Sequence, residues 1–337
     1  MTLTPVPVVI DTDPGLGEPG SDIDDGLAIA LALRSPELEV LGLTVVNGNV
    51  DAMTGVDVAR RLTERLGCPD LPVLLGATQP LVREMAPLRA MFDRAMPPRT
   101  SDRAGGAAEA SVAPLGPTSP QHAADFLAEQ AAARPGELVV IAIGPMTNLA
   151  LALQRHPELA GQVRELVLMA GSATGYAQNI TVVGDFNTYA DPEALDIVLR
   201  SGAPVRMVGL DQTARVMLDR DDAATLRASG SEFGRWAGTC ADSWIDYLGR
   251  AFPARVEHRT SCFLHDPLVI AAVTHPELLT WAVADVRVET ISELARGLVV
   301  ADRGLSLTVP GPANATVATD VAIEEFRALF LARIAAA

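Results

Sequence analysis

Five aspartates stand close together near the start of the chain, where an apolar run gives way to a helical one. They are Asp11, Asp13, Asp22, Asp24 and Asp25. A single carboxylate at a helix N-terminus is an ordinary cap, because the helix dipole favours it. Several like charges at close range repel one another unless a cation lies among them. Oxygen ligands of this kind favour a hard cation, Ca²⁺ or Mg²⁺, over zinc.

Four more polar clusters occur later in the chain. Taken singly, they have simpler explanations as turns, helix caps, a surface loop or a structural histidine. Amide and carboxylate groups are also suited to recognising hydroxyls, since they accept or donate hydrogen bonds. The clusters are Asn47 with Asn49, Thr147 with Asn148, Asn179 with Asp185 and Asn187, and His265 with Asp266.

Together these groups indicate one type of reaction. A cation held by carboxylates acidifies a water molecule and binds two vicinal hydroxyls at once. Asn and Asp side chains around it would hold a polyol such as a pentose, and a nearby histidine could give a proton to a leaving group. The combination indicates glycosyl transfer to water through an oxocarbenium-like transition state.

The elements that must position these groups alternate along the chain. Short, continuous apolar runs are typical of strands buried on both faces, and helical patterns separate them. We expect a single α/β domain over residues 1–337, with a mostly parallel open sheet flanked by helices and a Rossmann-like core. Ligands bind beyond the carboxyl ends of the strands in such sheets, and most of the polar clusters fall there.

The boundaries follow from the apolar runs and from capping residues. Asp191 is the expected N-cap of one helix, with Pro192 as its first residue. The expected strands are Val8–Ile10, Glu39–Val46, Val73–Leu75, Leu138–Ile143, Leu166–Met169 and Val205–Val208, and the expected helices are Gly26–Leu33, Val56–Leu66, His122–Ala133 and Pro192–Leu199.

Three regions depart from this alternation. Residues 99–120 lack periodicity and are expected to form a long loop that closes over the ligand. Residues 232–252 place aromatic residues at helical spacing, which fits either a core or subunit-contact stripe or the wall of a pocket. Residues 281–337 are expected to form strands followed by the helix Ile323–Ile334. The stripe in the second region consists of Phe233, Trp236, Cys240, Trp244 and Tyr247.

Composition excludes several classes of protein. The formal net charge of −16 argues against nucleic acid or an anionic membrane surface as a partner. Three scattered cysteines without a CxxC pair suggest neither a disulfide framework nor a zinc site. The sequence shows no signal-peptide pattern and no apolar run of the ~20 residues that span a membrane. We therefore expect a cytoplasmic protein.

The motifs resemble those of the inosine–uridine-preferring nucleoside hydrolase family. The signature of that family, Asp-x-Asp-Pro-Gly-x-Asp-Asp, is matched by Asp11, Asp13, Pro14 and Gly15 followed by the Asp24–Asp25 pair. The match continues in the same order through "VVNGN", "GPMTN", "NITVVGDFN" with "DPEA", and "HDPL". The resemblance implies hydrolysis of ribonucleosides to a free base and ribose, with Ca²⁺ as cofactor, in a homo-oligomer, a dimer or tetramer.

The resemblance also implies a role for each site residue. Asp13 would take the proton from the attacking water, His265 would act as acid for the departing base, and Asp11 would support the metal ligands from behind. The implied calcium ligands are Asp13, Asp25, Asp266 and the main-chain carbonyl of Thr147. The implied ribose-binding residues are Asp24, Asn49, Met169, Asn179, Asp185 and Asn187.

Three departures from the family pattern bear on these roles. The segment 16–22 expands the signature loop and makes Asp22 an alternative for one carboxylate role; we prefer Asp24 and Asp25, which are adjacent and directly precede the helix. Asp185 stands where the family usually has Glu, so its sugar contact is expected to be longer or water-mediated. Residues 80–110 contain no histidine, although family members often carry one after the third strand, which leaves the preferred base open.

Two other interpretations start from the same residues. The pair Asp11 and Asp13 after a strand resembles the nucleophile motif of some phosphatases, but that class needs a phosphate-binding Lys and Ser or Thr at later strand ends, where this chain has Asn and Asp. A calcium-stabilised sugar- or nucleoside-binding protein without turnover is the second alternative, and the presence of both Asp13 and His265 argues against it. Release of free ribose distinguishes the hydrolase from both.

Overall fold

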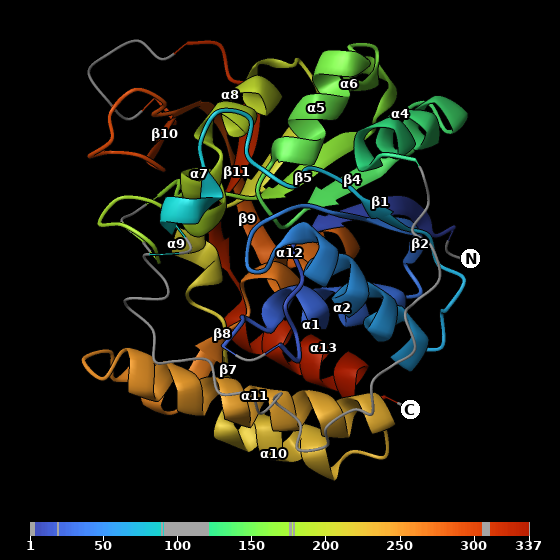
Figure 1. Cartoon of the computed structure of the whole chain (residues 1–337), viewed down its shortest axis with the longest axis vertical. Helices are drawn as coiled ribbons and strands as arrows, with labels where there is room; N and C mark the ends of the chain where they lie inside the picture. The colour runs from blue at the N-terminus through green and yellow to red at the C-terminus, as the bar shows by residue number, and fades with distance from the viewer. Residues whose placement is uncertain are drawn as a thin grey trace.

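The apolar runs form the strands of a nine-stranded sheet (Figure 1). The computed structural model describes residues 4–18, 20–88, 90, 121–174, 177, 179–304 and 311–336. All six expected strands are present. They are β1 (Val6–Thr12), β2 (Leu38–Val45), β3 (Val73–Leu75), β4 (Val139–Ala142), β5 (Glu165–Met169) and β6 (Val205–Val208), and β9 (Leu279–Val288), β10 (Val299–Asp302) and β11 (Ala315–Val321) complete the sheet.

The strand order is β10-β9-β11-β6-β5-β4-β1-β2-β3. All neighbours from β11 to β3 are parallel, whereas β9 is antiparallel to both β11 and β10. The mostly parallel open sheet is therefore confirmed. The chain winds outward in one direction from β1 to β3 and in the other from β4 to β6, so the connections diverge between β1 and β4. Open α/β sheets bind ligands at such a divergence, beyond the carboxyl ends of the strands.

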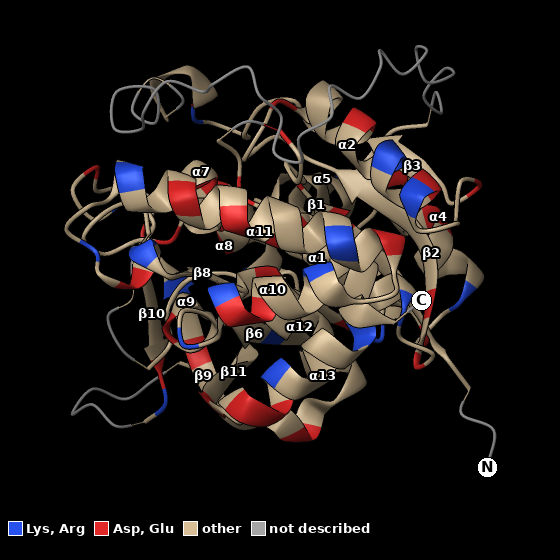
Figure 2. Cartoon of the chain, turned by 90° about the horizontal axis from the view of Figure 1, so that it is seen from below, with Lys and Arg blue, Asp and Glu red and all other residues tan. Residues whose placement is uncertain are grey.

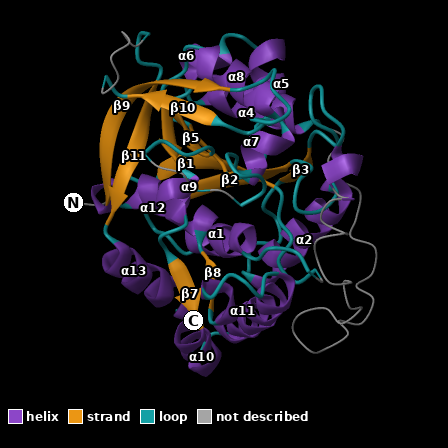
Figure 3. Cartoon of the chain, turned by 90° about the vertical axis from the view of Figure 1, so that its left-hand side faces the viewer, coloured by secondary structure: helices purple, strands orange, loops and turns teal. Residues whose placement is uncertain are grey.

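Helices cover both faces of the sheet (Figure 3). Val8 and Ile10 of β1 pack in one hydrophobic core, and Val9 between them packs in the other. Because both faces are covered, consecutive residues in the middle of the strand are apolar, which explains the continuous run Val8–Ile10. The first core involves α1 (Asp24–Leu33), α2 (Ala52–Arg65), α12 (His265–Thr274) and α13 (Ile323–Ala335), and the second involves α4 (Ala123–Ala133), α5 (Thr147–Arg155), α6 (Leu159–Gln162) and α8 (Pro192–Arg200).

The expected helices are confirmed, with some differences in where they begin. Helix α2 begins at Ala52 rather than Val56, because the side chain of Asp51 accepts a hydrogen bond from the backbone N–H of Thr54 and so caps an earlier turn. Asp191 caps α8 as expected, accepting from the N–H of Ala194 at 3.1 Å. Residues 99–120, the expected loop, lie outside the described residues.

A small unit packs on the side of the molecule where α1 lies. It contains β7 (Met217–Asp219), α10 (Arg220–Ala228), α11 (Glu232–Ala251) and β8 (Ser261–Phe263), and β7 pairs antiparallel with β8. Seen from below, α11 lies across the molecule close to α1 and α10 (Figure 2). The remaining short elements are α7 (Phe186–Ala190), α9 (Leu210–Thr213) and the 3-10 turns η1 (Glu257–Arg259) and η2 (Pro276–Leu278).

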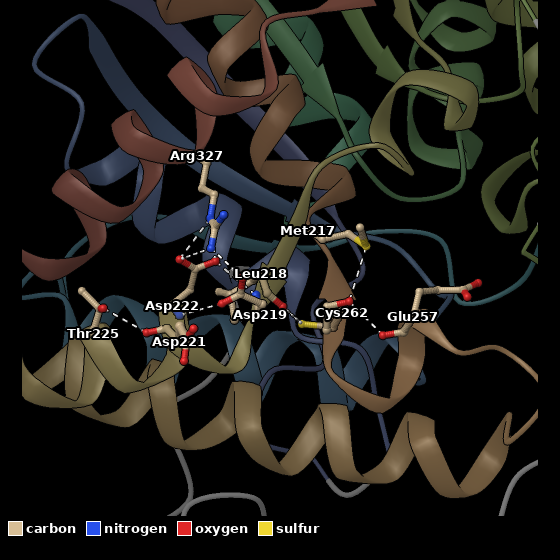
Figure 4. Close-up of polar contacts among 10 residues, drawn as sticks. Met217, Leu218, Asp219, Asp221, Asp222, Thr225, Glu257, Cys262 and Arg327 are labelled. Carbon is tan, nitrogen blue, oxygen red and sulfur yellow. Dashed lines mark hydrogen bonds and ion pairs between the residues drawn. The ribbon is translucent and has the colours of Figure 1, made fainter.

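Arg327 of α13 fastens this unit to the main domain (Figure 4). Its guanidinium donates to both carboxylate oxygens of Asp222, at 2.9–3.1 Å, and to Asp219 at 2.6 Å. Asp219 and Asp222 form the capping box of α10. The side chain of Asp222 is only 6% exposed, so it depends on this arginine for its counter-charge. Helix α11 packs on α10 and also on the main core.

Among the described residues, no helix is both long enough and apolar enough to cross a membrane.

We expect Arg327→Met to lower the free energy of unfolding by about 1–3 kcal/mol, because it leaves a nearly buried carboxylate without its partner. Chemical denaturation monitored by circular dichroism measures this loss. Arg200→Met is the matched control: Arg200 is 78% exposed and pairs with Asp196 on the same helix, so its loss should cost no more than about 0.5 kcal/mol. Equal stabilities of the two variants would contradict the anchoring role.

Candidate active site

The acidic residues of the signature meet at the carboxyl end of β1. Asp11 lies on β1 itself and Asp13 directly follows it. Asp24 and Asp25 occupy the first turn of α1, and Asp266 occupies the first turn of α12, a helix that packs against α1. Carboxylate oxygens of Asp24, Asp25 and Asp266 all lie within 4.8 Å of one another. We call these three residues the acidic triad.

A set of hydrogen bonds holds Asp25 and Asp13 in place. Asp25 Oδ1 accepts from the hydroxyl of Thr12 and from the backbone N–H of Asp13, the latter at 3.0 Å. Asn49 donates from its side chain to Asp25 Oδ2 at 2.9 Å and from its backbone to Asp13 Oδ2 at 2.7 Å. Asp13 Oδ1 is enclosed and, among the described residues, has no hydrogen-bond partner. A buried acceptor oxygen without a donor fits a bound cation, which would satisfy it.

Asp11 lies deeper than the triad. It is completely buried, and its Oδ1 accepts from Thr44 at 2.5 Å and from Asn148 at 2.8 Å. The amide oxygen of Asn148 in turn accepts from the backbone N–H of Ala77 at 2.7 Å. Asp11 is therefore engaged within the protein and does not border the cavity.

Burial and mutual repulsion raise the pKa of every one of these carboxyls. Burial is the largest cause; it raises the pKa of Asp11 to about 7 and that of Asp25 to about 6. The pKa values of Asp13, Asp24 and Asp266 are well above the usual range, through burial first and neighbouring carboxylates second. Carboxylates so arranged, with only oxygen donors, fit a hard divalent cation whose charge would offset their repulsion.

The triad borders a cavity of about 380 Å³, within the range of small-molecule sites. Amide, carboxylate and thioether groups from loops, from the end of β5 and from the starts of helices contribute to its lining, and so do aromatic residues of α11 and of the segment that follows. The residues of interest are Asp22, Asp24, Asp25, Asn49, Met169, Asn179, Asp185, Asn187, Trp244, Tyr247, Phe252, Arg255, His258, Phe263, His265 and Asp266.

The amides in the wall are oriented by the backbone. Asn187 donates from Nδ2 to the carbonyl oxygens of Ile143 and Met169, at 2.8 and 3.2 Å. Its Oδ1 has no partner within the described part of the chain. Asn179 accepts at Oδ1 from the N–H of Phe186, at 2.8 Å, which leaves its amide hydrogens as donors. The wall thus offers both an acceptor and donors to a hydroxylated ligand.

The comparison with known proteins agrees with this arrangement. A sequence model described as inosine-uridine preferring nucleoside hydrolase matches residues 8–328. The chain belongs to this family. It is therefore a hydrolase that acts on N-glycosyl bonds of nucleosides, and the fold and the family resemblance inferred from its motifs are confirmed.

The similarity to relatives and to solved structures covers most of the chain. It is 35% identical to uridine nucleosidase 1 of Arabidopsis thaliana over 88% of this chain and 82% of that protein. It is also 35% identical to the pyrimidine-specific ribonucleoside hydrolase RihA of Citrobacter koseri over 98% of both chains. The plant nucleoside hydrolase PpNRh1 superposes with a TM-score of 0.85 at 30% identity, covering 99% of this chain and 100% of that one. A purine-preferring ribonucleoside hydrolase from Gardnerella vaginalis gives 0.81 at 31% identity, over 98% of both.

The motifs predicted a set of site residues. Most of them line the cavity, and three do not. Asp11, Asp13 and Thr147 do not line the cavity, although Asp13 bonds to two residues that do. The hydroxyl of Thr147, at the start of α5, donates to Asp191 at 2.7 Å. The residues that do line it are Asp24, Asp25, Asn49, Met169, Asn179, Asp185, Asn187, His265 and Asp266. The individual roles, the calcium, the homo-oligomer and the cytoplasmic location stay predictions.

The structure also places the two residues that depart from the family pattern. Asp22, from the expanded loop, lines the cavity beside the triad, as does Trp244, and burial raises the pKa of Asp22. Asp185 caps α7, accepting from the N–H of Thr188 at 3.2 Å and from that of Gly171 at 2.7 Å. Both of its oxygens are thus engaged with the backbone, which limits the reach of this short side chain.

Sequence reasoning missed part of the cavity wall. Phe252, Arg255, His258 and Phe263 follow α11 in the stretch "FPARVEHRTSCFLHD" and were not predicted to act. The signal was their position between an aromatic helix and the His265–Asp266 motif. Trp244 and Tyr247 are both buried and part of the wall, so α11 serves as a core helix and as a pocket wall.

The raised pKa values predict how stability changes with pH. Without a metal, the folded carboxyls release their protons less readily than unfolded ones, so the free energy of unfolding should fall as pH rises from about 4 to about 7. The expected slope is at most about 1.4 kcal/mol per pH unit for each carboxyl that stays protonated. Thermal unfolding in chelator measures this, and Ca²⁺ should restore stability more at the upper end of this range.

The control is Asp70→Asn, which changes an exposed carboxylate far from the acidic residues in sequence and should keep the full slope. Asp25→Asn should reduce it. If the free energy of unfolding of the wild type in chelator stays constant or rises between about pH 4 and about pH 7, the raised pKa values of these buried carboxyls would be contradicted.

Proposed function

We propose that the chain hydrolyses the N-glycosidic bond of ribonucleosides in a calcium-dependent reaction. The observation that supports this most is the acidic triad at one side of a cavity whose adjoining wall offers amide donors and acceptors. A cation at the triad would face the hydroxyls of a pentose held by those amides. The products are the free base and ribose.

The calcium ligands we propose are Asp13, Asp25, Asp266 and the main-chain carbonyl of Thr147. The unpartnered Oδ1 of Asp13 and the closeness of Asp25 to Asp266 support this choice. Asp24 is the third member of the triad, and we assign it to a ribose hydroxyl beside the cation. When bound, the cation would lower the pKa of a water molecule and offset the charge of the carboxylates. Oxygen donors alone do not distinguish Ca²⁺ from Mg²⁺; the family resemblance favours Ca²⁺.

The remaining residues would bind the ribose or accept a proton from the attacking water. We assign the ribose to Asn49, Met169, Asn179, Asp185 and Asn187 in addition to Asp24, with Asp185 making its contact at longer range or through water. Asp13 would accept a proton from the attacking water. The C1′–N bond breaks with its electron pair leaving on the base, and positive charge on the sugar is met by the surrounding carboxylates.

His265 would assist the departing base. Its ring is buried beside the triad, and its Nδ1 shares a hydrogen bond of 2.8 Å with the hydroxyl of Thr213. Burial, followed by the nearby His258, lowers the pKa of His265 to about 3, so the ring is uncharged near neutral pH. A neutral imidazole held at Nδ1 offers its Nε2 side to the base, where it donates a hydrogen bond as the base accumulates charge.

Release of reducing sugar from a panel of purine and pyrimidine ribonucleosides tests the proposed function. We expect activity that chelation abolishes and Ca²⁺ restores. Asp25→Asn should lose bound calcium in elemental analysis and lower kcat/KM by ~10³-fold or more, because the cation and its charge are lost together. Asp70→Asn is the control and should behave like wild type. Nucleoside binding without any sugar release would instead support the binding protein without turnover.

The role of His265 is tested by changing the leaving group. The leaving group of a p-nitrophenyl riboside, p-nitrophenolate, departs as a stable anion and needs no hydrogen-bond donor. The bases of uridine and inosine need such a donor when they depart. His265→Ala should therefore slow uridine or inosine hydrolysis ~10²–10⁴-fold and affect the p-nitrophenyl riboside far less. Equal losses on both substrates would mean that His265 only positions the site.

A further inference from the structure

The hydroxyl of Thr213 contacts His265 from outside the cavity lining. Thr213 is the last residue of the short helix α9, is completely buried and does not line the cavity. Its Oγ1 lies 2.8 Å from Nδ1 of His265, and neither side chain makes another hydrogen bond to the described residues. This one bond therefore determines how the imidazole is held, and Nε2 is the nitrogen left for a ligand.

Helix α9 keeps that hydroxyl in a fixed place. The backbone N–H of Leu210 donates to the carbonyl oxygen of Gly171 at 2.7 Å. The N–H of Ala173 donates to the carboxylate of Asp211 at 2.9 Å. Both bonds join α9 to the segment that follows β5, and α9 also packs against α12, which begins at His265. The hydroxyl and the imidazole thus belong to elements that are packed on each other.

The direction of the bond follows from the donors and acceptors that the two side chains possess. The hydroxyl of Thr213 has one proton, and Nδ1 of His265 is its only acceptor among the described residues. If Nδ1 carried a proton, the hydroxyl would have to accept, and its own buried proton would lack an acceptor, which is costly. Thr213 therefore donates, Nδ1 is bare, and the single proton of the ring lies on Nε2.

A bond of this direction would assist the departure of the base. In the proposed reaction the electron pair of the C1′–N bond moves onto the base, and Nε2–H of His265 donates a hydrogen bond to it. As that bond strengthens, negative charge shifts onto the imidazole, and a hydroxyl that donates to Nδ1 stabilises it. The stabilisation is larger in the transition state than in the bound substrate, so it lowers the barrier.

We propose that Thr213 is a positioning residue for the reaction: its hydroxyl holds His265 in the tautomer with the proton on Nε2 and keeps that N–H available to the departing base. The proposal rests on the proposed function, in which His265 assists the base. Thr213 itself does not line the cavity, so it acts on the substrate only through the imidazole.

Thr213→Val tests this role, because it replaces the hydroxyl by a methyl group and keeps the branched side chain. With Ca²⁺ present, we expect kcat/KM for uridine and inosine to fall ~5–30-fold, since a bond to a nitrogen that gains charge is lost. The p-nitrophenyl riboside, whose leaving group needs no donor, should change by less than about threefold. Thr213→Ser keeps the hydroxyl and should stay within about threefold of the wild type on all three substrates.

Nitrogen NMR of isotope-labelled histidine measures the tautomer directly in the calcium-loaded protein, and His265→Ala identifies the resonances of this ring. We expect a protonated Nε2 and a bare Nδ1 whose resonance is displaced by the hydrogen bond that it accepts. Thr213→Val should move the Nδ1 resonance to the position of a bare nitrogen without a donor, and Thr213→Ser should restore it. A role in packing alone would not move this resonance.

The matched control is Thr274→Val. Thr274 is the last residue of α12, its hydroxyl lies 2.9 Å from Nδ1 of His275, and it does not line the cavity. This variant removes an equivalent hydroxyl from a histidine outside the site, so it should leave all rates and the resonances of His265 unchanged.

Three results would overturn the proposal: a proton on Nδ1 in the wild type, an unchanged Nδ1 resonance in Thr213→Val, or equal losses of that variant on all three substrates. If Thr213→Val does not fold, the spectra of the wild type and of Thr213→Ser decide: a displaced, bare Nδ1 in both supports the proposal, and a protonated Nδ1 overturns it. A chain that releases no ribose would refute the proposed function, and the spectra would still decide whether Thr213 fixes the ring. A chain that releases ribose but shows one of the three results would refute the role of Thr213 alone.

Discussion

The structure depends on the burial of several carboxylates at one point, between β1, α1 and α12. Each would lose much of its hydration there, and each repels the others. Hydrogen bonds from Thr12, Asn49 and Thr44 offset part of this cost. The remaining cost raises the pKa values of the carboxyls, so that bound protons neutralise charge that a cation would otherwise neutralise. Binding of a cation at this point would be coupled to folding, because the same carboxylates would enter both equilibria.

Two of the helices that begin at this point, α1 and α12, carry carboxylates in their first turn. Helices α1, α5 and α12 start beside the site, and none has a side chain that caps its first turn. Helices α2, α8 and α11, farther away, are capped by Asp51, Asp191 and Ser231. The first-turn N–H groups of α1 and α12 thus lie with Asp24, Asp25 and Asp266, so the positive ends of both helices help to hold negative charge. Helices α1 and α12 thus have no side-chain cap, and the carboxylates of their first turns line the cavity.

Much of this arrangement could be predicted from sequence because its signals are local. Continuous apolar runs define strands buried on both faces, and Asp24 and Asp25 precede an apolar helix in a pattern that is readable without the fold. Arg255 and His258 could not be predicted in this way, because their approach to the cavity depends on where α11 ends. The bond from Asn148 to Asp11 joins residues far apart in the chain, and no local pattern encodes it. Asp185 was recognised, but its use as a helix cap appears only in three dimensions.

The two parts of the cavity therefore have separate structural origins. The acidic part is fixed by the ends of parallel strands and by the two helices that start there, so its geometry changes only if the sheet changes. The aromatic part comes from α11, which packs on α10 and on the main core, and from the segment that follows α11. Substitutions in this second part can alter the lining of the cavity without moving the carboxylates. The chain is similar both to a relative named for pyrimidine substrates and to one named for purine substrates, so its overall likeness does not distinguish the two kinds of base.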